Sequence, residues 1–427
     1  MNLKEWWKWF KDLHVSRKWY VILILIRPII DNFWELKEAS ALASPLYIVG
    51  ALTPVFIGMS LLSHKFPQKP YAVEDNPFRF FAIMLAFNAI IFWFIQVTVV
   101  AFGDLIKYLT PILIFVYARH FVQSKKDLHG ILTTFLISCI FPFGVLAYES
   151  IFNPIAVEFI SQGRGGGSRI RGAYADIMNY AIYLMGFMLC IGYYFLNGIY
   201  NPKPGRSKIN ATHLVLSLMF ILYGLSRIRH VSTWGVAIAL LGLLLVHNLK
   251  NTRGALFVIV FGLVVATFFA QDIYTDNIQP LIEKELKVAD GESDVDQAFN
   301  GRMNRWERYF EIWEQMPALN HFTGIVSANF KETIVMIGGG MHSDYVRLLF
   351  LTGFIGLFFY LIFLFSVLAK WTLLQMPEKF ILSGAVGAIM LWSISTVPTL
   401  YAPLLYLIYP IFAYALLPKS RYYLETE

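Results

Sequence analysis

Long apolar stretches, separated by short polar segments, recur along almost the whole of this 427-residue chain. One helix of about 20 apolar residues crosses the roughly 30 Å of hydrocarbon in a bilayer. By that measure the pattern predicts about twelve transmembrane helices. Their approximate limits are 20–34, 41–62, 80–102, 105–122, 131–148, 174–196, 214–225, 231–246, 256–270, 345–368, 380–397 and 401–417. The least distinct boundaries lie between the seventh and eighth helices and between the last two.

Composition agrees with this pattern, because 57% of the residues are hydrophobic and only 15% are charged. A soluble chain of this length would carry far more charge. We therefore predict an all-α polytopic membrane protein in which residues 1–427 form one integral membrane domain. Cys139 and Cys190 fall within predicted helices, so the cysteines support neither a disulfide framework nor a cysteine metal site.

The distribution of lysine and arginine predicts the orientation of the chain. If every predicted helix crosses the bilayer, alternate connecting segments lie on the same side, and one such set holds most of the cations. Lysine and arginine are retained in the cytoplasm, so this set and both termini are predicted to be cytoplasmic. Residues 1–18, in which tryptophan and lysine are interleaved, predict an interfacial cytoplasmic helix, although a charged flank with aromatic anchors predicts almost the same sequence.

Three segments on the opposite side carry arginine against this rule. They are the glycine-rich segment 162–172, the turn 227–230 and the long loop 271–343 between the ninth and tenth helices. Arginine presents a planar fork of donors that suits paired contacts with phosphate oxygens. Glycines around Arg169 and Arg171 also let backbone amides approach an anion closely. These segments predict a site for a lipid diphosphate; the alternative is that flexible arginines reach lipid headgroups.

The long outer loop holds two further candidates, an arginine-rich helical segment and a single histidine. A spacing of three places Arg302, Arg305 and Arg308 along adjoining faces of a helix. His342 lies just before the tenth predicted helix and beside Asp344, whose carboxylate can set the histidine tautomer and raise its basicity. An ordinary histidine pKa of about 6.5 suits proton transfer near neutral pH. The alternative is a polar cap at the start of a helix.

Acidic residues in the same loop permit a competing, metal-dependent interpretation. Asp290, Glu292, Asp294 and Asp296 offer the oxygen ligands that Mg²⁺ and Mn²⁺ prefer. The surrounding sequence is typical of a solvated turn, so we expect no metal and no other cofactor.

A pair of ionisable residues also occurs inside the first predicted helix. Arg27 and Asp31 lie one helical turn apart, at a depth where charge is costly. They predict an internal ion pair or, alternatively, a direct part in the path of a lipid substrate.

Several short motifs stand in a fixed order along the chain. They are Arg169-x-x-Gly172-x-Tyr174 with Asp176 and Asn179, then Ser226-Arg227, then Arg302-x-x-x-Trp306 with Pro317 and Gly324, and finally His342-Ser343-Asp344-Tyr345 with Gly353 and Gly356. Together these motifs resemble the O-antigen ligase and polymerase superfamily of bacterial surface-glycan assembly. The chain departs from the family's usual pattern in the longer spacing from Pro317 to Gly324 and in Ile177-Met178, where Pro-Asn is common.

The resemblance implies a GT-C-type glycosyltransferase of the bacterial inner membrane, with its active site at the outer face. Such an enzyme moves a glycan from undecaprenyl diphosphate to a glycan or lipid A-core acceptor, and the family is regarded as inverting and metal-independent. We expect His342 and Arg302 to be catalytic and Arg169, Arg171, Arg227 and Arg305 to bind the diphosphate, with Asp344, Asp176 and Asn179 as candidate acceptor-site residues. The expected partners are the lipid-linked donor, the acceptor and the bilayer, and nucleic acid is not expected.

Two alternatives remain open. A dozen apolar helices with buried charge also describe a transporter or a flippase of lipid-linked glycans, although transporters commonly bind substrate near the bilayer midplane, between two related halves. Within the enzyme class, a polymerase passes the glycan to another lipid-linked repeat unit, whereas a ligase passes it to lipid A-core or a protein hydroxyl. Both need the same donor site, and the resemblance slightly favours a ligase.

Overall fold

The structure, a computed structural model, describes a large part of the chain. The described residues are 1–36, 44–63, 67, 72–95, 99–152, 157–158, 168–169, 174, 176–201, 209–228, 230–248, 302–324 and 341–418, with short pieces between 274 and 291. Side chains are described in these ranges except at 92, 95, 99–104, 157–158, 168–169 and 302–304. The predicted helix at 256–270, Arg171 and most of the acidic turn lie outside the described residues.

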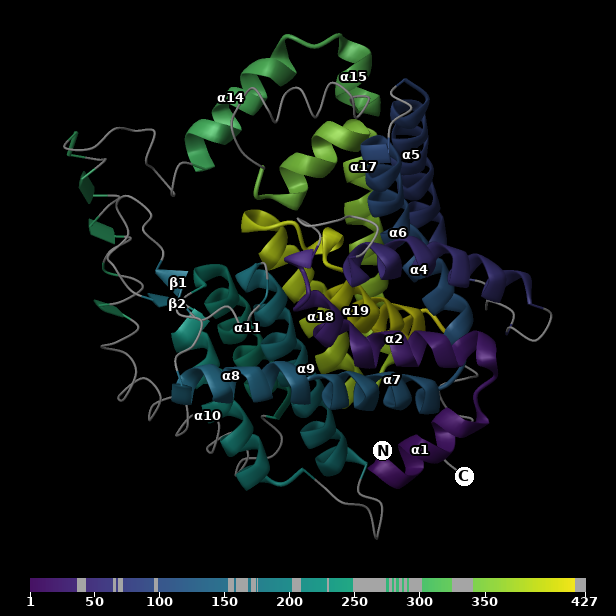
Figure 1. Ribbon diagram of the computed structural model, residues 1–427, viewed down its shortest axis with the longest axis vertical. Coiled ribbons are helices and arrows are strands. Elements are labelled where there is room, and N and C mark those ends of the chain that lie inside the picture. Colours follow the sequence, from purple (N-terminus) through teal and green to yellow (C-terminus); the bar gives the residue numbers. More distant parts are fainter. Residues whose placement is uncertain are drawn as a thin grey trace.

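Most of the described residues form helices (Figure 1). These are α1 (Leu3–Asp12), α2 (Val15–Asp31), α4 (Pro45–Leu62), α5 (Asp75–Ile95), α6 (Val99–Phe121), α7 (Lys125–Ser138), α8 (Ile140–Phe152), α9 (Ile177–Tyr200), α10 (Ala211–Ile228), α11 (Val231–Asn248), α14 (Arg302–Glu314), α15 (Ala318–Thr323), α17 (Asp344–Ala369), α18 (Met376–Ser395) and α19 (Ala402–Ala415). Two 3-10 helices, η3 (Lys370–Leu373) and η4 (Pro398–Leu400), join the last three. A short antiparallel ribbon pairs β1 (Val157–Glu158) with β2 (Ser168–Arg169).

Seven helical segments in the described part of the chain are long and apolar enough to cross a membrane. They are Pro45–Leu62, Lys125–Phe152, Ile177–Tyr200, Ala211–Ile228, Val231–Asn248, Asp344–Leu373 and Met376–Ser395. Even the shortest, at 18 residues, is about 27 Å long, close to the thickness of the hydrocarbon layer. The predicted class, an all-α polytopic membrane protein, is confirmed.

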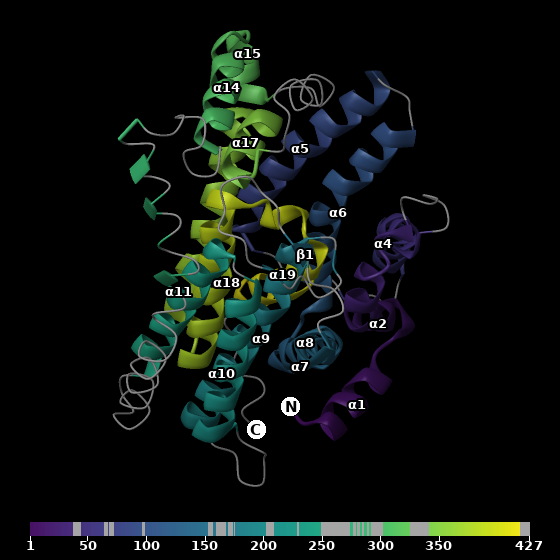
Figure 2. The same ribbon diagram turned by 60° about the vertical axis from the view of Figure 1, so that its left-hand side comes forward.

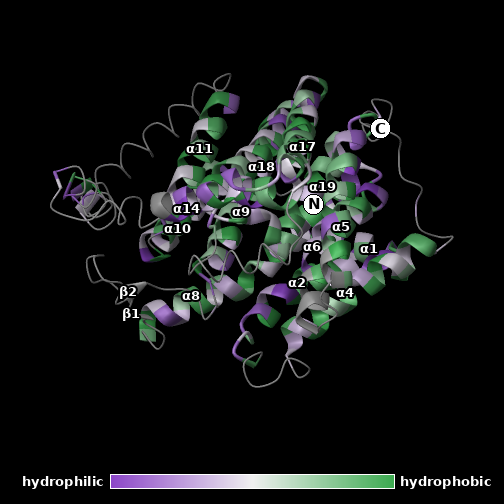
Figure 3. Ribbon diagram, turned by 90° about the horizontal axis from the view of Figure 1, so that it is seen from above, coloured by the Kyte–Doolittle hydropathy of each residue, from purple (hydrophilic) through white to green (hydrophobic). Residues whose placement is uncertain are grey.

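The outward faces of the long helices, α5 included, carry exposed apolar side chains, as a lipid environment requires. On α4, Val55 and Met59 are exposed, and on α5 so are Ile83 and Phe87. Figure 3 shows hydrophobic residues along the helices across the whole molecule rather than only at its centre. Such extensive exposed apolar surface is rare on soluble monomers and is favourable against lipid chains.

The observed boundary between α5 and α6 differs from the predicted one. The prediction placed it at 103–104, whereas α5 ends at Ile95 and α6 begins at Val99. The reason is that the sequence from 89 to 102 is apolar almost without interruption, so hydrophobicity does not mark where the chain turns.

Helix α9 lies at the centre of one half of the molecule, where it packs against α10, α11, α18 and α19 (Figure 2). Glycines permit close approach here, because a Cβ on Gly192 would meet the ring of Phe380 and one on Gly384 would meet Leu189. Small residues at such crossings are typical of helix packing in membranes. Helices α7 and α8 cross α9 at a steep angle in both views.

Ion pairs join the helix ends that the charge pattern assigns to the cytoplasmic side. The pairs are Arg17–Asp127 (2.7 Å), Arg119–Asp75 (2.9 Å), Lys125–Glu378 (2.5 Å) and Lys370–Glu74 (2.5 Å). The first joins the starts of α2 and α7, and the third joins the starts of α7 and α18. The other two join the start of α5 to the end of α6 and to η3, which follows α17. Several of the predicted cytoplasmic cations therefore also serve as connections between helices.

Candidate functional site

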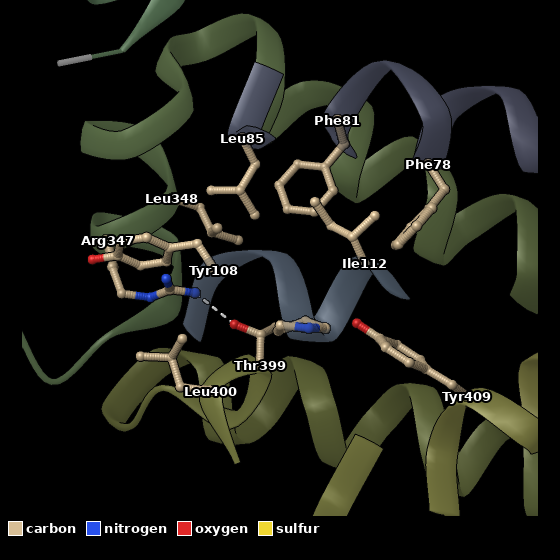
Figure 4. Close-up of a pocket in the computed structure, with 11 residues that line it drawn as sticks. Phe78, Phe81, Leu85, Tyr108, Ile112, Arg347, Leu348, Thr399, Leu400 and Tyr409 are labelled. Carbon is tan, nitrogen blue, oxygen red and sulfur yellow. Dashed lines mark hydrogen bonds between the residues drawn. The ribbon is translucent and has the colours of Figure 1, made fainter. Parts of the chain in front are cut away.

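Helix α17 is interrupted at Gly353, where φ is 67° and ψ is −174°. Before this break, Arg347 lines the same pocket as Leu85 of α5 (Figure 4). Leu351 lies one turn after Arg347 on α17, and Asn88 lies about one turn after Leu85 on α5. The side chain of Asn88 donates a hydrogen bond of 2.6 Å to the carbonyl oxygen of Leu351. The first part of α17 therefore runs in the same direction as α5.

After the break the chain runs the opposite way. Tyr360 packs against Phe81, and Phe363, further along α17, packs against Phe78, which is earlier on α5. The predicted helix 345–368 is thus not continuous but interrupted at Gly353. It consists of a short segment that rises along α5 and a longer one that returns, with Gly353 at the turn.

Two glycines fix the position of this turn against α15. Gly324, which ends α15, and Gly353 both have positive φ, and a Cβ on either would collide with the backbone of the other segment. Only glycine adopts such a conformation without strain. Asn88 bridges the two segments, because its Nδ2 donates to the carbonyls of Thr323 (2.9 Å) and Leu351 (2.6 Å). The outer-loop helix α15 is therefore locked to α17 and α5.

His342 lies just before α17 in a strained backbone conformation. Its φ of 47° is the one positive value at a non-glycine residue in the described part of the chain. Such conformations cost about 1–3 kcal/mol and cluster at functional sites. The imidazole is exposed, whereas the next residue, Ser343, is buried and donates through Oγ to the carbonyl of Ser393 at 2.9 Å. The backbone thus holds His342 at the surface beside the end of α18.

Helix α14 is attached to the backbone next to this histidine. The indole Nε1 of Trp306 donates to the carbonyl oxygen of Met341 at 2.8 Å. Arg302, the first residue of α14, lies one turn before Trp306 on the same side of the helix. Arg305, adjacent to Trp306, is half-buried. The structure therefore brings the arginine-rich helix beside the backbone that precedes His342.

The side of α14 that carries Trp306 also packs on the first part of α17. The rings of Tyr309 and Trp313 both contact Phe350. Burial raises the pKa of Tyr309 to about 12, even though the nearby charge of Arg305 acts to lower it. Tyr309 therefore stays a neutral, packed side chain at physiological pH.

Asp344 is fully buried and forms a compact network with its neighbours. It accepts hydrogen bonds from Nε and Nη2 of Arg347 (2.8 and 2.6 Å) and from the backbone N–H and Oγ1 of Thr399 (2.8 and 3.0 Å). These contacts tie the start of α17 to η4. The carboxylate is thus directed into a structural network, and the expected role in acceptor binding stays a prediction.

Asp176 reaches the same turn from α9. It caps the start of α9 and accepts a hydrogen bond from the hydroxyl of Tyr401, which follows Thr399 by two positions. Asn179 is half-buried, about one turn into α9. Asp176 and Asp344, far apart in the sequence, are therefore linked through η4.

Two other predicted arginines, Arg227 and Arg169, lie at the end of the molecule where α9 begins. Gly224 of α10 contacts Leu184 of α9, so these antiparallel helices place the last turn of α10 beside the first turns of α9. Arg227 in that last turn is exposed and makes no ion pair with any described residue. Arg169 lies in β2, shortly before α9. Whether their side chains converge on His342 stays a prediction.

The predicted ion pair in the first helix is present, whereas the predicted acidic metal ligands lie mostly outside the described residues. Arg27 and Asp31 form an ion pair of 2.8 Å, and both are largely buried, so the expected internal pair is confirmed. Of the four acidic residues proposed as metal ligands, the structure describes Asp290, which is exposed, and Glu292, Asp294 and Asp296 lie outside the described residues. The described side chains contain no group of three that is suited to a metal.

Sequence reasoning missed three members of this site: Arg347, Thr399 and Tyr401. One signal was available, because Asp344 and Arg347 are spaced by three at the start of an apolar helix, where ionisable residues are costly and usually functional. Thr399 and Tyr401 gave no such signal. Their partners are distant in the sequence, and only the packing of η4 brings them together.

Residues 212–361 match the model of a protein family described as O-antigen ligase. The matched region runs from α10 to the part of α17 beyond its break, and it contains Arg227, Arg302, Arg305 and His342. No curated protein matches the chain.

Proposed function

Because this match places the chain in the O-antigen ligase and polymerase superfamily, we propose that the protein is a membrane glycosyltransferase. It transfers a glycan from undecaprenyl diphosphate to an acceptor hydroxyl. The predicted family is confirmed, and the chain is an integral membrane protein by its apolar helices. The carrier, the acceptor and the position of the active site at the outer face of the bacterial inner membrane belong to the proposal.

One observation supports this function more than any other, namely the hydrogen bond from Trp306 to the carbonyl of Met341. It joins the helix that carries Arg302 and Arg305 to the strained backbone at His342. A base beside fixed cations is what transfer from a lipid diphosphate requires, because the leaving group is already activated.

The proposed reaction is a single displacement at the anomeric carbon. The acceptor oxygen forms a bond to that carbon while the bond from the carbon to the diphosphate oxygen breaks, which inverts the configuration. The imidazole of His342 takes the hydroxyl proton. The departing diphosphate carries the electron pair, and Arg302 and Arg227, with Arg169, Arg171 and Arg305, neutralise the charge that develops on it.

Transfer by purified protein, from a lipid-linked glycan to an acceptor, tests the proposal directly. Formation of a new glycosidic bond is the expected result. Movement of the donor across a vesicle membrane with every glycosidic bond intact would instead identify a flippase. Activity that persists in EDTA is also expected, since no metal takes part in the proposed reaction.

The acceptor distinguishes a ligase from a polymerase. In cells that lack the protein, accumulation of long lipid-linked chains indicates a missing ligase, whereas single capped repeat units indicate a missing polymerase. We favour a ligase, in keeping with the description of the matched family.

A further inference from the structure

The N-terminal helix α1 is attached to the rest of the protein by one face. A capping box at Asn2 fixes where the helix begins. Trp6 donates its indole N–H to Thr134 of α7 at 2.9 Å. Trp9 donates in the same way to Asp127, near the start of α7, at 3.2 Å. Helix α1 therefore has a fixed rotation, and the residues on its other faces point in defined directions.

Around the rest of α1, side chains of one kind lie together in strips along the helix axis. At about 3.6 residues per turn, Leu3 and Trp7 lie above one another beside the attached face, and they are 66% and 49% exposed. The next strip, the lysine strip, consists of Lys4, Lys8 and Lys11, which are exposed and fall within roughly 60° of the helix circumference. An apolar strip next to a basic one is typical of a helix that lies in a membrane interface.

The lysine strip has no anionic partner among the described residues. Other cations at the same end of the molecule, such as Arg17 and Lys125, form ion pairs that join helices. None of the three lysines of the strip forms such a pair with a described residue. Lys11 lies instead over the ring of Trp7, with its Nζ 5.1 Å from the ring centroid. The strip is therefore available to a partner of opposite charge.

Helix α1 also lies at the end of the molecule where an anionic lipid surface is expected. It is at the opposite end from α14 and α15 of the predicted outer loop in both Figure 1 and Figure 2. Anionic lipids give the cytoplasmic leaflet a negative surface potential, and each lysine near that surface strengthens the attraction about fivefold. Lysines reach such headgroups while their stems and neighbouring apolar side chains stay in the interface.

We propose that the lysine strip binds the headgroups of anionic phospholipids in the cytoplasmic leaflet, while Leu3 and Trp7 insert beside them at the top of the acyl chains. The adjacent strips favour a lipid surface over a soluble anionic protein, because a soluble partner would neutralise the lysines and leave the apolar strip in water. This lipid contact goes beyond the proposed function and does not depend on it.

The test measures which lipids surround α1 in the full-length protein, reconstituted into phosphatidylcholine bilayers with rising fractions of phosphatidylglycerol. Leu3→Cys provides an attachment point for a fluorophore on the apolar strip. Its matched control is Asp12→Cys, because Asp12 is exposed on the opposite side of the helix. Cys139 and Cys190 are fully buried, so the label is confined to the introduced thiol. In each series one of the two lipids carries brominated acyl chains, which quench the fluorophore on contact.

We expect brominated lipid to quench the label at Leu3→Cys and to leave the label at Asp12→Cys unquenched. Quenching at Leu3→Cys should show a preference for phosphatidylglycerol over phosphatidylcholine of at least about tenfold. Replacement of all three lysines of the strip by glutamine should abolish this preference, whereas replacement by arginine should retain it. High salt should weaken the preference as well.

An unquenched label at Leu3→Cys would overturn the proposal, because α1 would then face water or another protein. Energy transfer between labelled copies would in that case identify the partner as a second copy of this chain. Equal quenching by the two lipids, or an unchanged preference in the glutamine variant, would also contradict it, because charge would then play no part. Melting temperatures in detergent show whether each variant folds. If the glutamine variant does not, the salt dependence of the preference decides in its place.

Discussion

Trp306 donates its indole N–H to the carbonyl oxygen of Met341 across 2.8 Å. This bond joins a helix of the outer loop to the residue that precedes His342. Met341 and Trp306 are 35 positions apart in the sequence, so the bond closes a long loop and fixes where the arginines of α14 lie relative to the imidazole.

Replacement of Trp306 by Phe removes this donor while keeping an aromatic ring. We expect kcat for glycan transfer to fall about five- to tenfold, as the loss of one hydrogen bond implies, with little change in melting temperature. Trp7→Phe, at an exposed position on α1, is the control and should be fully active. A Trp306→Phe enzyme with unchanged kcat would show that the bond does not position the site.

His342→Ala is expected to remove the group that accepts the acceptor proton. Loss of a general base typically lowers kcat by about 10²- to 10⁴-fold. His213→Ala, at an exposed position near the start of α10, provides a histidine control with normal activity. Rates are compared after confirming equal expression and melting temperature. A folded His342→Ala protein with wild-type transfer would refute the assignment.

Arg302→Ala is expected to weaken stabilisation of the departing diphosphate. The cost is about 3 kcal/mol in the barrier, or roughly a hundredfold in rate. Arg308→Ala on the same helix removes an exposed arginine and is expected to change the rate less than about threefold. Equal effects of the two substitutions on kcat/KM would mean that α14 contributes general positive charge rather than a specific contact.

Gly353→Ala is expected to disrupt the reversal of α17. Alanine is strained at a φ of 67°, and its Cβ would collide with the backbone before Gly324. Together these effects should lower the free energy of unfolding by about 2 kcal/mol or more. Gly387→Ala in α18, where a Cβ meets nothing within 4 Å, is expected to be neutral or slightly stabilising. Thermal unfolding in detergent gives the comparison, and equal melting temperatures would argue against a strict need for glycine.

Asp344→Asn is expected to be strongly destabilising, because it leaves the buried charge of Arg347 without compensation. Removing one partner of a buried ion pair typically costs about 3–5 kcal/mol. The double variant Asp344→Asn/Arg347→Met removes both charges and should recover much of that stability. Thermal unfolding of the single and double variants measures this coupling, and additive effects would contradict a direct pair.

The amino-acid sequence alone was enough to predict an all-α membrane protein and the family that the chain resembles. Apolar runs long enough to cross a bilayer require helices there, because every backbone polar group must be satisfied within the segment. Local spacing also gave the Arg27–Asp31 pair and the order of the arginine and histidine motifs. These features depend on residues that are close in sequence or on composition alone.

The positions of the turns and the partners of the polar groups became known only from the folded structure. Hydrophobicity did not mark the end of α5 at Ile95 or the reversal at Gly353, since both occur within apolar sequence. The links from Asp344 to Thr399 and from Asp176 to Tyr401 span 55 and 225 positions. Such contacts arise because buried polar groups must find partners wherever packing brings them, and no local pattern records which partner that is.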